Sequence, residues 1–327
     1  MSDIQFTTEL GEYIINDSIK FLSGPLGKKL KNKVNLILTS PPFPLNKKKD
    51  YGNLHGEAYK KWLVDLAPIF SELLAPDGSI VIELGNAWES GRPIQALLPI
   101  ESLLEFVKNK KADLRLCQEF ICFNPSRLPS PAQWVTVNRI RTVDSYTHVW
   151  WMAKTDNPKA DNSRILKPYS KRMQQLIKNQ KYNSGKRPSA HKIGEKSFLK
   201  DNGGSIMHNF LEFEQINPET PLRLPSNVLS FSNTSSNDHF SRACRENGII
   251  PHSARMSPML ATLFIEFLTE EGDLILDPFA GSNTTGYCAE KLGRKWLGIE
   301  IDEKYIYQAL LRHQNPELNS VIITSNG

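Results

Sequence analysis

The sequence predicts an α/β protein, a doubly wound Rossmann-like sheet with a loop-rich region inserted in it. Short apolar runs alternate with segments of helical periodicity towards both ends of the chain, as in parallel sheets covered by helices on both faces. This periodicity disappears between residues 154 and 252, where Pro, Ser, Asn and Gly become frequent. Polar residues follow several of the apolar runs, where open α/β sheets bind ligands.

Length and composition exclude several protein classes. With 327 residues and 39% hydrophobic content, the chain can bury a large core. It has no run of about 20 apolar residues and no secretory signal pattern, so we expect a cytoplasmic protein without membrane contact. The four cysteines are dispersed and lack zinc-site spacing, which predicts reduced, mostly buried thiols and no metal.

The first half of the chain predicts a strand, a helix and a second strand. Residues 34–38 are apolar and stop at a proline pair, which is typical of a buried parallel strand. Helical spacing follows over residues 62–73, and Pro-Asp-Gly at 76–78 predicts a turn into a strand at 79–83. Further elements are expected in sequence order, namely a helix at 97–107 and strands at 118–123 and 147–153.

The last part of the chain repeats the pattern. A helical face over residues 256–268 precedes a strand at 273–277, a helix at 284–292 and a strand at 295–301. Across the whole chain, four polar residues fall at predicted strand ends: Ser40, Glu83, Asp277 and Glu300. Because carboxyl ends of parallel strands share one edge of a sheet, we expect these four side chains to converge on a ligand site.

The turn after residue 277 favours a nucleoside ligand. Phe279-Ala280-Gly281 lacks bulk that would keep a ligand from the backbone, and Glu300 is placed to accept hydrogen bonds from a ribose diol. The alternative is a tight strand-to-helix connection without a ligand. The full G-x-G-x-x-G pattern is absent, so a nicotinamide or flavin cofactor has little support.

Positive charge is concentrated in the region without periodicity. Residues 154–201 hold 13 Lys or Arg against 4 Asp or Glu, a local charge of +9, which leaves −4 for the rest of a chain whose net charge is +5. Aromatic residues are interleaved with these cations, a pattern that fits phosphate contacts along a nucleic acid. A solvated basic face is the alternative.

The chain resembles the β-class amino-methyltransferases of DNA, and more narrowly their cytosine-N4 branch. The resemblance rests on five segments and covers nearly the whole chain: Thr-Ser-Pro-Pro-Phe at 39–43, Phe-Asn-Pro-Ser at 123–126, Trp-Trp at 150–151, the segment 200–206 and Gly-Ser-Asn-Thr-Thr-Gly at 281–286. It implies a circularly permuted methyltransferase sheet with a catalytic half at 1–154, a target-recognition region at 155–247 and a cofactor-binding half at 248–327.

The resemblance implies transfer of a methyl group from S-adenosylmethionine to the exocyclic N4 amine of a cytosine extruded from double-stranded DNA. That amine is a poor nucleophile, so the site must position it and accept its proton. We expect the Ser40 hydroxyl and the Pro41 carbonyl to accept the amine hydrogens, Phe43 to stack on the base and Glu83 to bond Ser40 or contact the cofactor. The implied catalytic residues are Ser40, Pro41, Pro42, Phe43 and Glu83, and the implied cofactor-binding residues are Asp17, Asp277, Phe279, Gly281, Ser282, Asn283, Thr284 and Glu300.

Several alternatives stay open. Adenine N6 is the other target of this chemistry, and a DNA-binding module without catalysis is a function of a different class. Asp17 also fits a plain surface turn, Trp150 and Trp151 fit core strand positions, and Arg139 and Arg141 fit either DNA contact or ordinary surface charge. The resemblance further implies a monomer and a cognate restriction endonuclease as a genetic partner that it need not touch.

Overall fold

The computed structural model describes residues 4–43, 54–124, 127–182, 185–186, 192–194, 198–212, 238–251, 255–315 and 323–324. Some positions noted from the sequence, Pro125 and Ser126 among them, lie outside the described residues, as does part of the basic stretch.

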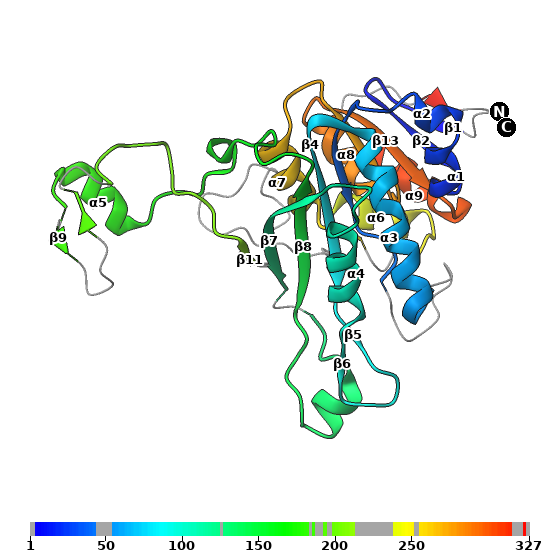
Figure 1. Cartoon of the computed structure of the whole chain (residues 1–327), viewed down its shortest axis with the longest axis horizontal. Coiled ribbons are helices and arrows are strands. Elements are labelled where there is room, and N and C mark those ends of the chain that lie inside the picture. The colour runs from blue at the N-terminus through cyan, green and yellow to red at the C-terminus, as the bar shows by residue number, and fades with distance from the viewer. Residues whose placement is uncertain are drawn as a thin grey trace.

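Figure 1 shows a large twisted sheet with helices on both faces and two extensions that leave the main body. The strand order is β11-β7-β8-β4-β3-β12-β13-β2-β1-β14. The central strands β4, β3, β12, β13 and β2 are parallel, whereas β8 runs antiparallel to β4 and β7. The strand bounds are β1 Ile4–Thr7, β2 Gly11–Ile15, β3 Val34–Thr39, β4 Leu74–Gly85, β7 Arg115–Phe123, β8 Tyr146–Ala153, β11 Phe210–Glu212, β12 Leu274–Asp277, β13 Lys295–Glu300 and β14 Ile323–Thr324.

The winding reverses between β3 and β12. After β3 the chain crosses one face through α3 (Gly56–Leu73) to β4, and after β12 it passes through α8 (Thr284–Lys291) to β13. One apolar cluster joins the sheet to α3 and α4 (Leu98–Val107), and another joins it to α7 (Pro258–Leu268) and α8. The sheet is therefore doubly wound, as expected, with its switch point between β3 and β12, and β2 and β1 from the start of the chain lie beyond β13. The remaining helices are α1 Ser18–Ser23, α2 Pro25–Lys28, α5 Lys171–Asn179, α6 His239–Glu246 and α9 Ile306–His313, with single turns η1 Gln133–Val137, η2 Asn162–Ile165 and η3 Glu303–Tyr305.

The expected turn at residues 76–78 is wrong. These residues lie inside the single strand β4, whose pairing with β3 shifts register between Val34 and Leu36. A Cβ on Gly78 would lie 2.7 Å from the Val34 carbonyl oxygen, so the glycine permits close approach of the two strands rather than a chain reversal.

The inserted region is more regular than its sequence indicates. It contains η2, α5, β11 and α6, together with the two-residue strands β9 (Gly185–Lys186) and β10 (Lys192–Ile193). Helix α5 buries none of its residues, and Ser170 caps its start, since the Ser170 hydroxyl accepts a hydrogen bond from the Met173 amide. Its half-buried Met173, Leu176 and Ile177 recur at helical spacing and form a short apolar face that was not predicted from the sequence. Figure 1 shows α5 and β9 standing apart from the sheet.

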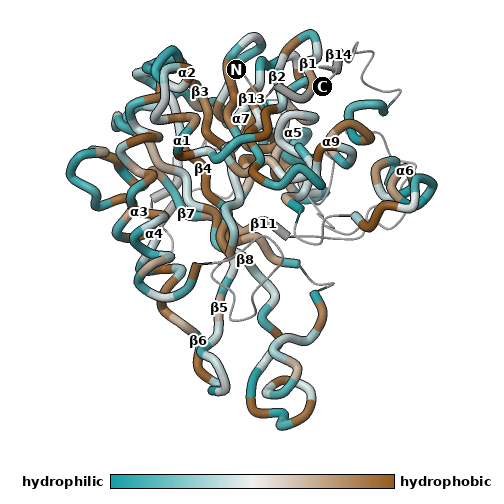
Figure 2. The backbone as a smooth tube through the Cα atoms, turned by 90° about the vertical axis from the view of Figure 1, so that its right-hand side faces the viewer, coloured by the Kyte–Doolittle hydropathy of each residue, from teal (hydrophilic) through white to brown (hydrophobic). Residues whose placement is uncertain are grey.

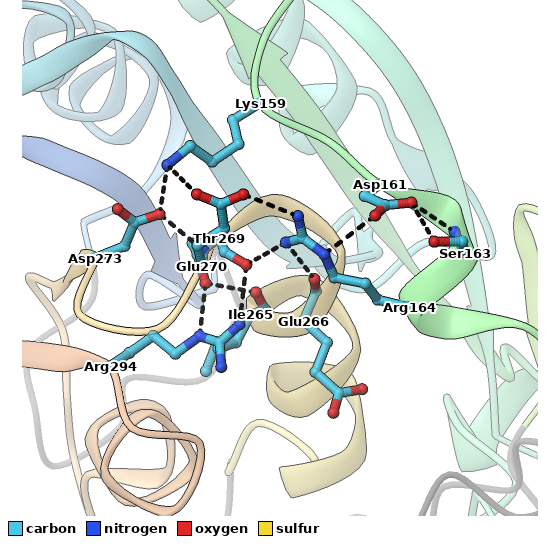
Figure 3. Close-up of polar contacts among 10 residues, drawn as sticks. All are labelled: Lys159, Asp161, Ser163, Arg164, Ile265, Glu266, Thr269, Glu270, Asp273 and Arg294. Carbon is cyan, nitrogen blue, oxygen red and sulfur yellow. Dashed lines mark hydrogen bonds and ion pairs between the residues drawn. The ribbon is translucent and has the colours of Figure 1, made fainter.

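A polar cluster fastens the start of the inserted region to the second half of the chain (Figure 3). The Arg164 guanidinium donates to the Thr269 carbonyl at 2.6 Å, and Arg294 donates to the same oxygen at 2.9 Å. Lys159 forms an ion pair with Asp273 at 2.8 Å. Thr269 ends α7 and Asp273 precedes β12, so the cluster lies at the amino ends of the central strands, away from their carboxyl edge.

Candidate active site

Ser40 and Glu83 meet at the carboxyl edge of the sheet. Ser40 directly follows β3 and Glu83 lies near the end of the neighbouring strand β4. The Thr147 hydroxyl of β8 donates to Glu83 Oε1 at 3.0 Å, and the Ser40 side chain lies near enough to the Glu83 carboxyl to lower its pKa.

Burial changes the acidity of Glu83. The residue is only 4% exposed, and desolvation raises its pKa from 4.5 to about 7, an increase that hydrogen bonds from Thr147 and Ser40 and the positive charge of Arg127 partly offset. A carboxyl group with a pKa near neutrality can both accept and release a proton at physiological pH.

The segment after Ser40 is packed against the end of β4. Pro41 is buried, while Pro42 and Phe43 are half-buried. A Cβ on Gly85 would lie 2.6 Å from the Phe43 ring, so this ring rests directly on the backbone of β4. The absence of a side chain at residue 85 thus permits the position of Phe43.

Asp277 joins the two halves of the sheet. Its Oδ1 accepts hydrogen bonds from the Thr39 hydroxyl at 2.7 Å and the Phe279 amide at 3.1 Å, and its Oδ2 accepts one from the Thr285 hydroxyl at 2.7 Å. Burial raises its pKa, although these three donors oppose the increase. The carboxyl group therefore holds β3, the turn after β12 and the start of α8 together.

The turn after Asp277 contacts the Glu300 carboxylate. Gly281 has φ +50°, and its amide donates to Glu300 Oε2 at 2.8 Å. The other oxygen, Oε1, accepts the Ile301 and Asp302 amides, both at 2.9 Å. A Cβ on Gly281 would meet no atom within 4 Å, so the turn has open space beside its backbone.

The next three residues face the protein interior. Asn283 is fully buried, and its Nδ2 lies 2.9 Å from Nε2 of His313. Ser282 accepts two hydrogen bonds from Arg312, through its carbonyl at 2.8 Å and its hydroxyl at 3.0 Å, and Thr284 is also buried. These side chains support the turn after β12 from the side of the protein interior.

Asp17 lies beside the end of β13. In the parallel pairing of β2 with β13, Ile15 is the partner of Glu300, and the Asn16 amide donates to the Glu300 carbonyl at 2.8 Å. The Asp17 carboxylate accepts the Lys20 amide at 3.0 Å and so caps α1. Asp17 therefore follows the strand that lies next to the one ending in Glu300.

Two contributors to this edge were not singled out from the sequence. The Trp62 ring of α3 is half-buried and lies 5.4 Å from the Phe279 ring, although helical spacing grouped Trp62 with the core. Thr147 bonds Glu83 from β8, and only the long-range pairing of β8 with β4 brings the two together. No sequence motif marks either residue.

Trp150 and Trp151 occupy core positions on opposite faces of β8. Each is 8% exposed, and they belong to different apolar clusters. The core interpretation of the two tryptophans is confirmed. The four cysteines are free thiols, and all except the half-buried Cys117 are buried.

No helix within the described ranges is long and apolar enough to span a membrane. The same residues contain no group of three or more His, Cys, Asp or Glu side chains arranged to hold a metal ion.

The fold corresponds to that of known methyltransferases. The family model described as DNA methylase matches residues 34–311, and the chain belongs to this family. The type II methyltransferase M.PvuII of Proteus hauseri is 38% identical over 322 residues, 98% of this chain and 88% of the relative. The type II methyltransferase M.BglII of Bacillus subtilis is 27% identical over 85% of this chain and 64% of its own length. The solved structure of the cytosine-N4-specific PvuII DNA methyltransferase aligns with a TM-score of 0.71 and 31% identity, covering 97% of this chain and 91% of that one.

Proposed function

We propose that this protein is a site-specific DNA methyltransferase that transfers a methyl group from S-adenosylmethionine to the exocyclic N4 amine of an extruded cytosine in double-stranded DNA. The observation that carries this proposal is the buried Glu83 carboxyl beside Ser40, on the same sheet edge as the turn at Gly281. The likeness to a cytosine-N4-specific enzyme over nearly the whole chain supports the choice of base.

The turn beyond β12 fits the cofactor. Gly281 leaves open space beside its backbone, and Glu300 Oε2 keeps an acceptor site beyond its bond to the Gly281 amide. The half-buried rings of Phe279 and Trp62 offer a flat apolar contact for an adenine. These residues, with Asp17 beside β13, would hold S-adenosylmethionine. The cofactor supplies an electrophilic methyl group on a sulfonium.

The roles of Asp277, Ser282, Asn283 and Thr284 in binding are indirect. Their side chains bond to or pack against the protein and fix the shape of the turn. We assign them as positioning residues for the cofactor.

Ser40 and Glu83 position the cytosine amine and accept its proton. The Ser40 hydroxyl and the Pro41 carbonyl accept the two amine hydrogens, which turns the nitrogen lone pair towards the methyl donor. As the nitrogen becomes positively charged, a proton passes to the Ser40 hydroxyl while Ser40 gives its own proton to Glu83. The Phe43 ring, held against Gly85, stacks on the base.

The DNA must approach this edge with the target base out of the helix, because the amine cannot reach the site inside a duplex. The basic region that starts after β8 supplies phosphate contacts, and α5 exposes Lys171, Arg172 and Lys178. We further propose a monomer in the cytoplasm, with a cognate restriction endonuclease that it need not touch.

The direct test is transfer of tritiated methyl groups from S-adenosylmethionine to unmethylated bacterial DNA, followed by nucleoside mass spectrometry. N4-methylcytosine is the expected product. N6-methyladenine would keep the fold and cofactor but overturn the base assignment. DNA binding without any methylated nucleoside, together with no cofactor binding in calorimetry, would instead support a non-catalytic DNA-binding module.

A further inference from the structure

The structure contains a projection that the proposed mechanism does not use. We call it the arm and define it as residues 86–97, with the hairpin of β5 (Ala87–Trp88) and β6 (Gln95–Ala96), plus residues 127–145, with η1. Both limbs extend past the carboxyl end of β4 and away from the sheet (Figures 1 and 2). The first limb continues β4, which carries Glu83, and the second leads into β8, which carries Thr147.

Polar contacts tie the two limbs together. Asp144 accepts hydrogen bonds from Asn86 Nδ2 at 2.8 Å and from the Trp88 indole at 3.3 Å. Nearer the end of the arm, Arg141 Nε donates to the Pro93 carbonyl at 3.0 Å. The arm is thus joined to the catalytic edge as a braced unit rather than as two separate loops.

The end of the second limb exposes apolar side chains. Val137 is 67% exposed and Ile140 is 50% exposed, and η1 buries none of its residues. Figure 2 shows hydrophobic positions along this limb, well away from the main body. Exposed apolar groups that contribute nothing to a core are typical of interaction sites.

The backbone holds this end in one shape. The Ile140 amide donates to the Trp134 carbonyl at 2.9 Å, and Gln133 Nε2 donates to Asn138 Oδ1 at 3.0 Å. Between the two apolar residues, Arg139 has φ +53°, a left-handed conformation that costs a non-glycine residue about 1 kcal/mol. Within the described part of the chain, the Arg139 guanidinium has no hydrogen-bond or ion-pair partner.

We infer that residues 137–140 insert into the target duplex and fill the space left by the extruded cytosine. This inference rests on the proposed function. Apolar wedges that enter a base stack lower the cost of opening it, and Arg139 between the two apolar residues is placed to contact a neighbouring phosphate. The continuity of the arm with the strands that hold Glu83 keeps the wedge beside the base pocket.

DNA fits this surface better than a second copy of the chain does. Two-fold self-association through this tip would bring Arg139 and Arg141 of the two copies towards each other, and like charges at an interface are unfavourable. A polyanion matches the alternation of cationic and apolar residues.

The test uses the double variant V137S/I140S. Its control is L26S, which removes an apolar side chain of similar exposure, 40%, from α2. Single-turnover methylation is measured on a duplex that carries the sequence methylated by the protein in an expressing host. A second duplex has an abasic site opposite the target cytosine, so that no base pair has to be broken.

On the paired duplex we expect the double variant to be about tenfold slower than the wild type, a typical share of the cost of unstacking a base. On the abasic duplex it should stay within about twofold of the wild type, which also shows that it is folded and binds the cofactor. L26S should match the wild type on both duplexes.

Three results would overturn the inference: an equal loss of rate on both duplexes, no loss on either, or a wild-type dimer in sedimentation that the double substitution dissociates. A wild-type protein that methylates neither duplex would contradict the proposed function itself, which separates the two failures.

Discussion

Two buried carboxyl groups on one sheet edge have different surroundings and hence different tasks. Asp277 accepts hydrogen bonds from Thr39, Thr285 and the Phe279 amide, all of which belong to the framework. Glu83 instead accepts a hydrogen bond from Thr147 and lies beside Ser40, a half-buried residue that follows β3, and burial raises its pKa to about 7. Their surroundings thus give Asp277 a structural role and leave Glu83 able to accept a proton.

Replacing Glu83 by Gln should lower the methyl-transfer rate about 100-fold or more, because the amide cannot accept the proton that Ser40 releases. The Ser40 hydroxyl can still bond the amide oxygen, so cofactor affinity should be unchanged. Rates under single-turnover conditions and calorimetric cofactor binding check this. Full activity in the variant would remove Glu83 from the mechanism.

The same substitution should alter how stability depends on pH. The pKa of Glu83 is raised on folding from 4.5 to about 7, so the folded state binds this proton more tightly. Its contribution to stability is fully present below about pH 4.5 and is lost as the pH rises through about 7. Relative to wild type, the Gln variant should gain stability over this interval, by at most about 3 kcal/mol. Urea unfolding at several pH values measures this difference, and parallel curves for the two proteins would contradict it.

Asp277→Asn tests the structural carboxyl group. An amide nitrogen facing the hydroxyl of Thr39 or Thr285 removes the acceptor for that hydroxyl, which should lower the free energy of unfolding by about 1–3 kcal/mol. Because the turn at Gly281 then loosens, cofactor affinity should also fall. Thr285→Val, which removes one donor only, is the milder control. Unchanged cofactor affinity in a destabilised Asn variant would show that the turn keeps its shape without this carboxyl.

At the scale of elements, prediction from the sequence succeeds where burial defines the element. The strands β3, β12 and β13 are apolar runs inside a covered sheet, and their ends place Ser40 and Glu300 correctly. Helix α5 buries no residue completely and most of the arm is exposed, so their conformation depends on caps and on contacts between limbs distant in the sequence, such as Arg141 to Pro93. Thr147 was missed for a related reason, since antiparallel pairing with β4 has no local signal.

Removing the guanidinium of Arg164 should loosen the attachment of the inserted region. Arg164→Ala deletes the 2.6 Å hydrogen bond to the Thr269 carbonyl, and we expect the free energy of unfolding to fall by about 1.5–3 kcal/mol. Arg294 still bonds that oxygen, so the decrease should stay near the lower end. Chemical denaturation provides the value. Arg92→Ala, which removes an exposed side chain paired with Glu89, is a suitable comparison. Equal stability of the Arg164 variant and wild type would show that the cluster does not hold the inserted region to the rest of the chain.

At the scale of the whole molecule, the chain places catalytic and cofactor residues on one edge and cationic side chains on the extensions. This separation predicts that binding to DNA and methyl transfer respond to different changes. Binding should depend strongly on salt, because phosphate contacts release counterions.

Replacing Lys171, Arg172 and Lys178 of α5 by Gln should weaken DNA binding. It should also reduce the slope of log K against log salt by about 0.9 for each phosphate that the protein no longer neutralises. Cofactor affinity should not change. Lys28 and Lys29, exposed at the end of α2, provide control substitutions to Gln. A salt slope equal to that of the wild type would mean that α5 does not touch the backbone of the DNA.

The hydrogen bond between Thr39 and Asp277 joins residues 238 positions apart, so it forms late in the synthesis of the chain. A nascent chain still attached to the ribosome can form β3 and β4, but it lacks the strand that must lie beside β3 and the turn that contacts Glu300. Since synthesis proceeds from the amino end, the catalytic edge is completed only after residue 300 has emerged. Translation products that stop early would therefore carry Ser40 and Glu83 yet have no means of modifying DNA.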